Sequence, residues 1–241
     1  MYFDQLYELE SGNFWFRARN ALINWALHRY FPAAASMLEV GCGTGYVLSD
    51  IGRNNPTLAL TASEIYIEGL RRTAQRITQA TFLQMDARRI PFTREFDVIG
   101  AFDVLEHIEE DERVLSEMAR ALKGGGGVLL TVPQHPWLWS GADAYAYHRR
   151  RYRRTELIGK LTGAGLRPVR CTSFVTLLLP LMLLSRLRQR KLSEFDPKSE
   201  FSIPAWMNRG LESALDAERA LIRAGVPLPF GGSLLVVAER S

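Results

Sequence analysis

The chain has 241 residues, of which 47% are hydrophobic and 23% charged, and its formal net charge is +4. This length suits one α/β domain with additions, and so small a net charge does not by itself indicate a nucleic-acid partner. The two cysteines, Cys42 and Cys171, argue against a disulfide scaffold or a cysteine-ligated zinc site. The first residues lack the basic and apolar regions of a signal peptide, so we expect a cytoplasmic protein.

Residues 13–30 have the pattern of a helix. Asn13 can cap it, and apolar residues follow at helical spacing, namely Trp15, Ala18, Leu22 and Trp25. Aromatic and basic side chains are concentrated at its start. Two interpretations are open. The helix packs against the edge of a sheet, or residues 1–32 form a helical lid in which Trp15 and Arg19 face a ligand held by the next segment.

A glycine loop follows the first predicted strand. Residues 36–41 form an apolar run typical of a buried strand, and Gly41, Gly43 and Gly45 then precede a helical pattern. A strand, a glycine loop and a helix bring backbone N–H groups and a helix N-terminus to one point. Such a point suits a ligand that approaches the main chain closely, because glycine has no Cβ to block it. The alternative is a glycine-rich turn without a ligand.

Acidic residues stand at the ends of the strands that follow. Further strands are predicted at residues 58–63, 81–85, 96–102 and 128–133, with helical patterns between them. Glu64 ends the second strand, 19 residues after Gly45, where a carboxylate binds the ribose hydroxyls in βαβ nucleotide sites. Asp86 and Asp103 follow the third and fourth strands. Since the carboxyl ends of parallel strands share one edge, we expect these acids beside the glycine loop.

The glycine spacing distinguishes between nucleotide ligands. A dinucleotide fingerprint has glycines at positions one, three and six, whereas the third glycine here falls at position five, Gly45. The segment from Glu39 to Gly45 resembles motif I of class I S-adenosylmethionine-dependent methyltransferases. The residues from Asp103 onward resemble the segment after the fourth strand of that family. The resemblance covers about residues 36–172.

This resemblance implies an α/β fold. The expected architecture is a Rossmann-like seven-stranded sheet of order 3-2-1-4-5-7-6, with strand seven antiparallel and helices on both faces. The implied cofactor is S-adenosylmethionine, with S-adenosylhomocysteine as its product. In that family the acid that matches Glu39 meets the methionine end of the cofactor, and the acid that matches Asp86 accepts a hydrogen bond from the adenine amino group. An NAD(P)-dependent oxidoreductase on a similar sheet is the rival interpretation.

The cofactor residues expected from the loop, the strand ends and the lid form one set. No metal ligand is expected in it or elsewhere in the chain. The set consists of Glu39, Gly41, Cys42, Gly43, Gly45, Glu64, Ile65, Asp86, Ala87, Asp103, Val104, Trp15 and Arg19.

Histidines after the fifth strand are candidates for a general base. Methyl transfer to a hydroxyl benefits from a base, and histidine suits neutral pH. His135 directly follows the strand and His148 lies in an aromatic and basic loop, so we predict both as catalytic, although single histidines are more often structural. His107 is assigned to a helix or to the cofactor shelf. Residues 135–154 resemble one bacterial branch of the class I enzymes, of methyltransferase type 11, 12 or 23, a branch that implies no particular acceptor.

Five arginines lie between residues 149 and 154. They fit either a solvated helix start or an anion site, because guanidinium groups bind phosphate and carboxylate. RNA would also meet this charge. However, the segment directly after the fourth strand has no Asn-Pro-Pro-Tyr-like motif and no cysteine with which to methylate a base. We therefore expect an anionic small molecule or a phospholipid rather than nucleic acid.

Residues 174–184 form an apolar stretch that is too short to span a bilayer. Because basic residues follow, residues 174–191 are candidates for peripheral membrane contact, for the roof of an apolar pocket, for a dimer contact or for a buried core helix. In the next helix, Glu218 lies on the apolar face, where we expect an arginine partner or else the substrate. We expect residues 174–230 to be a helical insertion between strands six and seven. The basic residues are Arg186, Arg188, Arg190 and Lys191.

Together these features predict a single class I methyltransferase domain over residues 1–241, cytoplasmic or peripheral at the inner membrane face. The predicted reaction is methylation, on oxygen, of a hydrophobic or anionic small molecule or a lipid-linked intermediate. The rival from outside enzyme chemistry is a non-catalytic, membrane-associated protein that binds S-adenosylmethionine. The sequence predicts neither the acceptor molecule nor the oligomeric state.

Overall fold

A seven-stranded sheet forms the centre of the computed structural model, which describes residues 2–189 and 203–240. Its order is β3-β2-β1-β4-β5-β7-β6, as predicted. The first five strands run parallel, whereas β7 is antiparallel to both β5 and β6. The strands are β1 (Ser36–Val40), β2 (Ala59–Glu64), β3 (Thr81–Gln84), β4 (Phe96–Phe102), β5 (Leu122–Pro133), β6 (Leu166–Phe174) and β7 (Ser233–Arg240).

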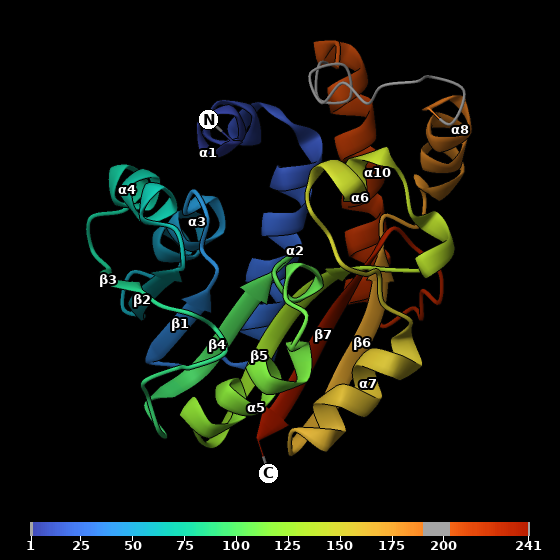
Figure 1. Ribbon diagram of the computed structural model, residues 1–241. Coiled ribbons are helices and arrows are strands. Elements are labelled where there is room, and N and C mark those ends of the chain that lie inside the picture. Colours follow the sequence, from blue (N-terminus) through green and yellow to red (C-terminus); the bar gives the residue numbers. More distant parts are fainter. Residues whose placement is uncertain (1, 190–202, 241) are drawn as a thin grey trace.

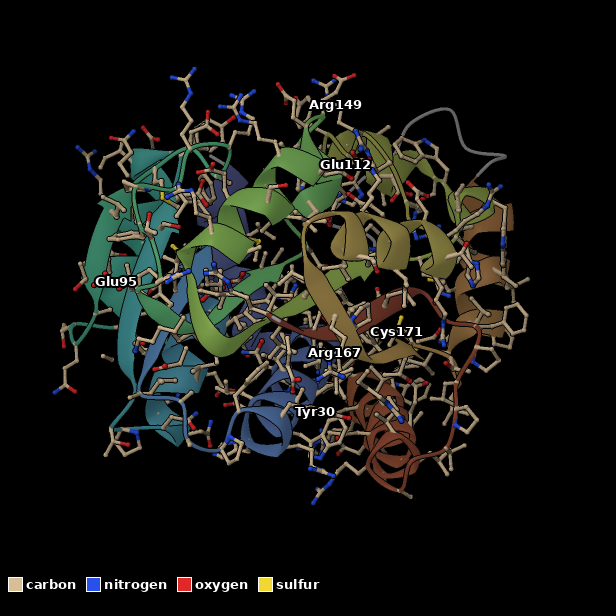
Figure 2. The ribbon with its side chains drawn as sticks, turned by 90° about the horizontal axis from the view of Figure 1, so that it is seen from below. Tyr30, Glu95, Glu112, Arg149, Arg167 and Cys171 are labelled. Carbon is tan, nitrogen blue, oxygen red and sulfur yellow. The ribbon has the colours of Figure 1, made fainter. Side chains whose placement is uncertain are left out.

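Helices cover both faces of this sheet (Figure 1). On one face pack α5 (Asp111–Ala121) and α7 (Arg154–Gly163). On the other pack α2 (Phe14–Tyr30), α3 (Tyr46–Asn54), α4 (Ile67–Arg76) and α10 (Ala205–Arg223). Figure 2 separates the two layers: Tyr30, at the end of α2, lies on one side of the sheet and Glu112 of α5 on the other.

Two hydrophobic cores follow from the strand pattern. Successive residues of a strand point to opposite faces, so Leu38 packs toward α5 and α7 while Met37 packs toward α2 and α3. On β5, Leu130 likewise packs on the same face as Leu38, and Leu129 packs on the same face as Met37. Strands that are buried on both faces need apolar residues at nearly every position, which is why they appear as continuous apolar runs in the sequence.

Short elements gather beyond the carboxyl ends of the parallel strands, at the upper edge in Figure 1. They belong to the segment before α2 and to the loops that leave β4 and β5. These elements are α1 (Tyr2–Leu9), η1 (Glu10–Gly12), η2 (Leu105–His107), η3 (Pro136–Leu138) and α6 (Gly141–Tyr145).

The fifth strand starts earlier than its apolar run predicts. A run of glycines such as 124–127 usually marks a turn or loop, but here these residues lie inside β5. Gly127 shows why glycine fits there. A Cβ at this position would lie 2.4 Å from the Ala238 carbonyl oxygen and 2.7 Å from the Phe31 ring. The close approach of β7 and Phe31 therefore requires a residue without a side chain.

Among the described residues, two helices lie between β6 and β7, namely α8 (Leu179–Gln189) and α10. The interpretation of residues 174–184 as a buried core helix is wrong, because Leu181 and Leu184 on α8 are nearly half exposed. Arg190 and Lys191 lie outside the described residues. Among the helices of the described ranges, none combines the length and the apolar character that crossing a bilayer requires.

Glu218 has a backbone partner in place of the predicted arginine, and its prediction as a substrate-facing residue stays a prediction. Its carboxylate is buried and accepts hydrogen bonds from the backbone N–H groups of Thr176 and Leu177, at 2.6 and 2.8 Å. The partner of this acid is therefore the start of the apolar stretch rather than an arginine. The contact ties α10 to the segment between β6 and α8.

Candidate active site

The glycine loop between β1 and α3 has the conformation that its glycines allow. Gly41, Gly43 and Gly45 have φ values of +68°, +55° and +74°, a region that residues with a Cβ rarely occupy. A Cβ on Gly41 would lie 2.7 Å from Val104, and one on Gly45 would lie 2.6 Å from Thr73. At Gly43 the nearest atom to such a Cβ is 4.0 Å away. The outer glycines thus permit packing, whereas Gly43 faces open space.

Glu39 is a buried carboxylate on β1, directly before the loop. Its side chain is 2% exposed, and Oε2 has no hydrogen-bond partner among the described residues. Burial raises the pKa of this carboxyl to about 8, although the charge of Arg19 opposes the shift. An unpartnered buried oxygen at this position can accept a hydrogen bond from a ligand.

Glu64, at the end of β2, closes over the same loop. Its carboxylate accepts hydrogen bonds from the backbone N–H groups of Gly43 and Ile65, at 3.0 and 2.9 Å, and of Tyr66, at 3.2 Å. Burial raises the pKa of Glu64, and these backbone donors oppose the shift. The spacing argument for Glu64 therefore correctly places an acid against the glycine loop.

Arg19 reaches this edge from α2. Its Nη1 donates to Oδ2 of Asp103 at 2.5 Å, and its guanidinium lies 4.6 Å from the centre of the Trp15 ring. Asp103 follows β4 with a φ of +57° and also accepts from the Thr131 hydroxyl at 3.2 Å. Nε of Arg19 is buried without a partner among the described residues. A buried arginine thus joins the end of β4 to the predicted lid helix.

The other predicted cofactor residues are distributed around this edge. The Val104 side chain packs on Gly41, and Cys42 is buried with its sulfur 3.4 Å from the Thr73 hydroxyl. Asp86 binds the Arg88 guanidinium, which lowers the pKa of its carboxyl. Ala87 is buried and Ile65 exposed.

The segment before α2 contributes residues that the sequence analysis missed. Phe3 of α1 is the group nearest the open side of Gly43. Glu10 of η1 accepts a 2.6 Å hydrogen bond from Thr44 in the glycine loop and pairs with Arg76 of α4 at 2.7 Å. The only signal for these contacts is the acidic and aromatic composition of residues 2–10, which does not indicate a partner.

His135 stands alone at the end of β5. Its backbone lies in the left-handed region, with a φ of +63°, and its ring stacks near Trp137 and Phe230. Nε2 is buried without a hydrogen-bond partner among the described residues. Burial, with the nearby Arg151 charge, lowers the pKa of His135, so the imidazole is neutral at pH 7. A neutral ring with a free nitrogen can accept a proton.

His148 lies in a different group from His135. Its Nδ1 is 3.0 Å from Oδ1 of Asp143, and its Nε2 is 3.9 Å from Oε1 of Glu106. The ring of His107 meets the ring of His148 edge-on, with 4.8 Å between their centres. The two predicted catalytic histidines thus have separate surroundings, and His107 belongs with His148.

The arginine cluster is mostly committed to internal contacts. Arg151 is buried and binds Asp143 at 2.7 Å and the Gln134 carbonyl at 3.1 Å. Arg150 pairs with Asp111, and Arg154 donates to the backbone of Leu228. Neither the solvated helix start nor the five-arginine anion site describes these three residues, which instead fasten the loop after β5 to the sheet.

Comparison with known proteins finds similarity to methyltransferases. Residues 38–130 match a family described as "Methyltransferase domain". A probable S-adenosylmethionine-dependent methyltransferase of Mycobacterium tuberculosis is 27% identical over 164 residues, which are 66% of this chain and 57% of that protein. A malonyl-acyl-carrier-protein O-methyltransferase of Haemophilus ducreyi is 34% identical over 98 residues, 38% of each chain. The crystal structure of the (4+2)-cyclase SpnF has a TM-score of 0.62 at 19% identity, covering 94% of this chain and 83% of that chain.

Residues 38–130 therefore resemble the methyltransferase domain of class I enzymes. The match covers little more than half the length of the mycobacterial relative, which is itself described as S-adenosylmethionine-dependent. Family, glycine spacing and sheet order agree, and they disfavour the oxidoreductase interpretation.

The residues of this methyltransferase domain fit S-adenosylmethionine. The cofactor carries an amino acid end, a positive sulfonium and a ribose. Glu39 offers an unpartnered buried oxygen beside the loop, and the absent Cβ of Gly43 leaves space next to it. Glu64 offers a carboxylate at the expected ribose position. The individual roles of these residues, like those of Trp15, Arg19 and Asp86, stay predictions.

Proposed function

We propose that this methyltransferase transfers the methyl group of S-adenosylmethionine to a hydroxyl oxygen of a hydrophobic or anionic small molecule or a lipid-linked intermediate. The observation that carries the choice of oxygen is His135. It follows β5 at the edge where the cofactor residues gather, it is neutral at pH 7, and its Nε2 has no partner among the described residues. A hydroxyl needs such a base more than an amine does, because a neutral amine attacks through its own lone pair, whereas a hydroxyl oxygen is a weak nucleophile until its proton is removed.

The chain's own residues would carry out three tasks. Glu39, Glu64 and the glycine loop bind and orient the cofactor, which supplies an activated methyl group when bound. Phe3 and Trp15, with the helices that bear them, exclude water from this edge. His135 accepts the acceptor's proton at Nε2 as the new oxygen–carbon bond forms. Alignment and exclusion of water are the larger contributions, since a sulfonium methyl is already reactive.

An apolar acceptor or a membrane contact is supported by α8. Leu177, just before α8, and Leu181 and Leu184 within it are each nearly half exposed, and Trp206 at the start of α10 is 77% exposed. Exposed leucines in one segment mark an interaction surface. We infer that the described part of the predicted segment, residues 174–189, contacts the substrate's apolar part or a membrane surface.

The acceptor class can be tested by labelling. Methyl-labelled S-adenosylmethionine and the purified protein are added to an extract of the source cells, which is then divided into organic and aqueous phases. Label in the organic phase supports a lipid-linked acceptor. Mild base releases the label if it is a methyl ester, whereas a methyl ether keeps it, and either product shows that the acceptor atom is oxygen. Label found only on nitrogen contradicts the proposal, and so does cofactor binding without any labelled product.

The base can be tested separately with His135→Ala. Because the pKa of His135 is lowered, activity should persist below pH 6.5 and fall as the pH drops through that lowered pKa. The variant should lose about 100-fold or more in kcat and lose this acidic limb of the profile. An unchanged kcat on an established hydroxyl acceptor would remove the base assignment.

A further inference from the structure

A compact group of ligand-type side chains lies beside the cofactor edge. Glu106 and His107 are on η2, directly after β4, and His148 is on the loop that follows α6. One ligand atom from each of the three lies within 4.8 Å of the other two. The sequence analysis expected no metal here, because 41 residues separate His107 from His148 and only the fold brings them together.

Glu106 is the unusual member of this group. Its side chain is fully buried, yet neither carboxylate oxygen has a hydrogen-bond partner among the described residues. A buried carboxylate without partners is costly, so a native structure normally provides a donor or a cation. The nearest candidate is His148, whose Nε2 is 3.9 Å from Oε1, too far for a hydrogen bond.

The second shell around His148 has the arrangement of a metal ligand. Asp143, which is 1% exposed, lies 3.0 Å from Nδ1 of His148 and so favours the tautomer with Nε2 free. Asp143 is itself fixed by Arg151 at 2.7 Å and by the Ser140 N–H at 2.8 Å. A carboxylate that holds the far nitrogen of a ligating histidine is the usual outer support of a zinc site.

We propose that Glu106, His107 and His148 bind a divalent transition-metal cation, with Zn²⁺ as the preferred ion. Two imidazoles and one carboxylate suit zinc, whereas Mg²⁺ and Ca²⁺ prefer oxygen ligands alone. Zinc ligands at about 2.0–2.2 Å lie roughly 3.4 Å apart, so the three ligand atoms, now within 4.8 Å of one another, would move closer together on binding. Three protein ligands leave one position open, as in catalytic zinc sites.

The open position gives the site a role that rests on the proposed oxygen methylation. An acceptor hydroxyl bound to the cation would lose its proton more readily. The proton passes to His135 or to water, the oxygen electron pair forms the bond to the methyl carbon, and the pair of the broken sulfur–carbon bond stays on sulfur. The substrate class that this geometry selects is a molecule whose hydroxyl oxygen can reach the one open position of the cation.

Metal binding can be measured without any acceptor. The full chain is freed of metal with a chelator and titrated calorimetrically with Zn²⁺, and then with Mg²⁺. One equivalent of Zn²⁺ should bind with micromolar affinity or better, and Mg²⁺ should bind far more weakly. Glu106→Gln and His148→Asn should each weaken Zn²⁺ binding about 100-fold or more. The matched control is His28→Asn, since His28 is exposed on α2, away from the group.

Two outcomes overturn the proposal: no saturable binding of Zn²⁺ by the wild-type chain, or binding that survives in both ligand variants. If Glu106→Gln does not fold, His107→Ala replaces it, because that side chain is exposed. Co²⁺ offers a second readout, as its visible absorption reports four-coordinate nitrogen and oxygen ligation. Zinc binding combined with methylation on nitrogen would support the site and contradict the proposed function, so the two claims fail separately.

Discussion

Glu39 carries an electrostatic strain that the cofactor would relieve. The side chain is buried with one oxygen unpartnered, and the pKa of its carboxyl is raised to about 8 from an ordinary value of 4.5. Between these two pH values the folded chain keeps a proton that the unfolded chain has released. The free energy of unfolding therefore falls as pH rises through this window.

Replacement of Glu39 by Gln should remove this dependence. In the absence of cofactor, the stability of Glu39→Gln relative to wild type should increase by about 1–3 kcal/mol between pH 5 and pH 8. The raised pKa values of other acids cancel in this difference, because both chains share them. Denaturant unfolding at both pH values provides the measurement, with Glu109→Gln on the surface as control. Parallel curves for the variant and the wild type would contradict the assigned pKa.

At the scale of single residues, the sequence predicts a contact when the parallel pairing of the strands alone brings the two residues together. Glu64 could be placed because a parallel sheet brings the end of β2 to the glycine loop, and its carboxylate accepts a hydrogen bond from the Gly43 N–H in that loop. Phe3 and Glu10 could not, because their partners depend on how the first helix packs. Glu106 was missed for a similar reason, since its burial beside His148 depends on the loop after α6.

The element that most affects access to the site is α1. Arg76 of α4 holds it with three contacts: Nη2 donates to the Tyr7 carbonyl at 2.7 Å, the guanidinium lies 4.1 Å from the Tyr7 ring centre, and Nη1 pairs with Glu10. Both Arg76 and Glu10 are about nine-tenths buried in this pair. Removing one partner of such a pair is costly, because the other charge is left buried.

Arg76→Ala should therefore loosen α1 from the glycine loop. We expect faster proteolytic cleavage within residues 1–12 and cofactor affinity that is weaker by about threefold to tenfold, with little change in the cooperative unfolding of the sheet. Arg53→Ala is the matched control, because Arg53 is exposed on α3. Within the described part of the chain, its side chain hydrogen-bonds only to Asp50. Equal cleavage of the two variants would show that α1 does not depend on this contact.

Some boundaries of helices and strands could be predicted from the sequence, and others depend on contacts with neighbouring elements. The buried strands and α2, with its Asn13 cap, follow from apolar period and capping chemistry. The early start of β5 does not, because glycines at 124–127 indicate a turn unless the neighbouring strand is known. The exposure of α8 was likewise hidden, since an apolar segment has the same sequence pattern whether it is buried or faces outward.

At the scale of the whole molecule, the apolar surface of α8 and the cofactor edge lie toward the same upper end of the structure (Figure 1). This arrangement would allow a substrate embedded in a membrane to reach the site without leaving the lipid. The sheet order could be predicted as soon as the glycine spacing indicated the family, whereas the position of α8 could not, because insertions between β6 and β7 have no fixed path.

Leu181→Ser should weaken binding to vesicles. With vesicles of 30% anionic phosphatidylglycerol in phosphatidylcholine, we expect the partition constant to fall about tenfold, because burying a leucine contributes about 1.5–3 kcal/mol. Leu221→Ser on α10 is the control, since Leu221 is 40% exposed compared with 49% for Leu181. Sedimentation of the vesicles gives the bound fraction. If the wild-type chain does not sediment with them, α8 serves the substrate or a protein contact instead.

The measurement that tests the central claim most directly is calorimetric titration of the purified chain with S-adenosylmethionine. We predict one site, displaced competitively by S-adenosylhomocysteine and lost in Gly43→Ala, whose new methyl group would enter the open side of the loop at a φ of +55°. Gly159→Ala, where a Cβ meets nothing within 4 Å on α7, should bind as the wild type does. Absence of S-adenosylmethionine binding, or binding of a reduced nicotinamide cofactor in its place, would contradict the account.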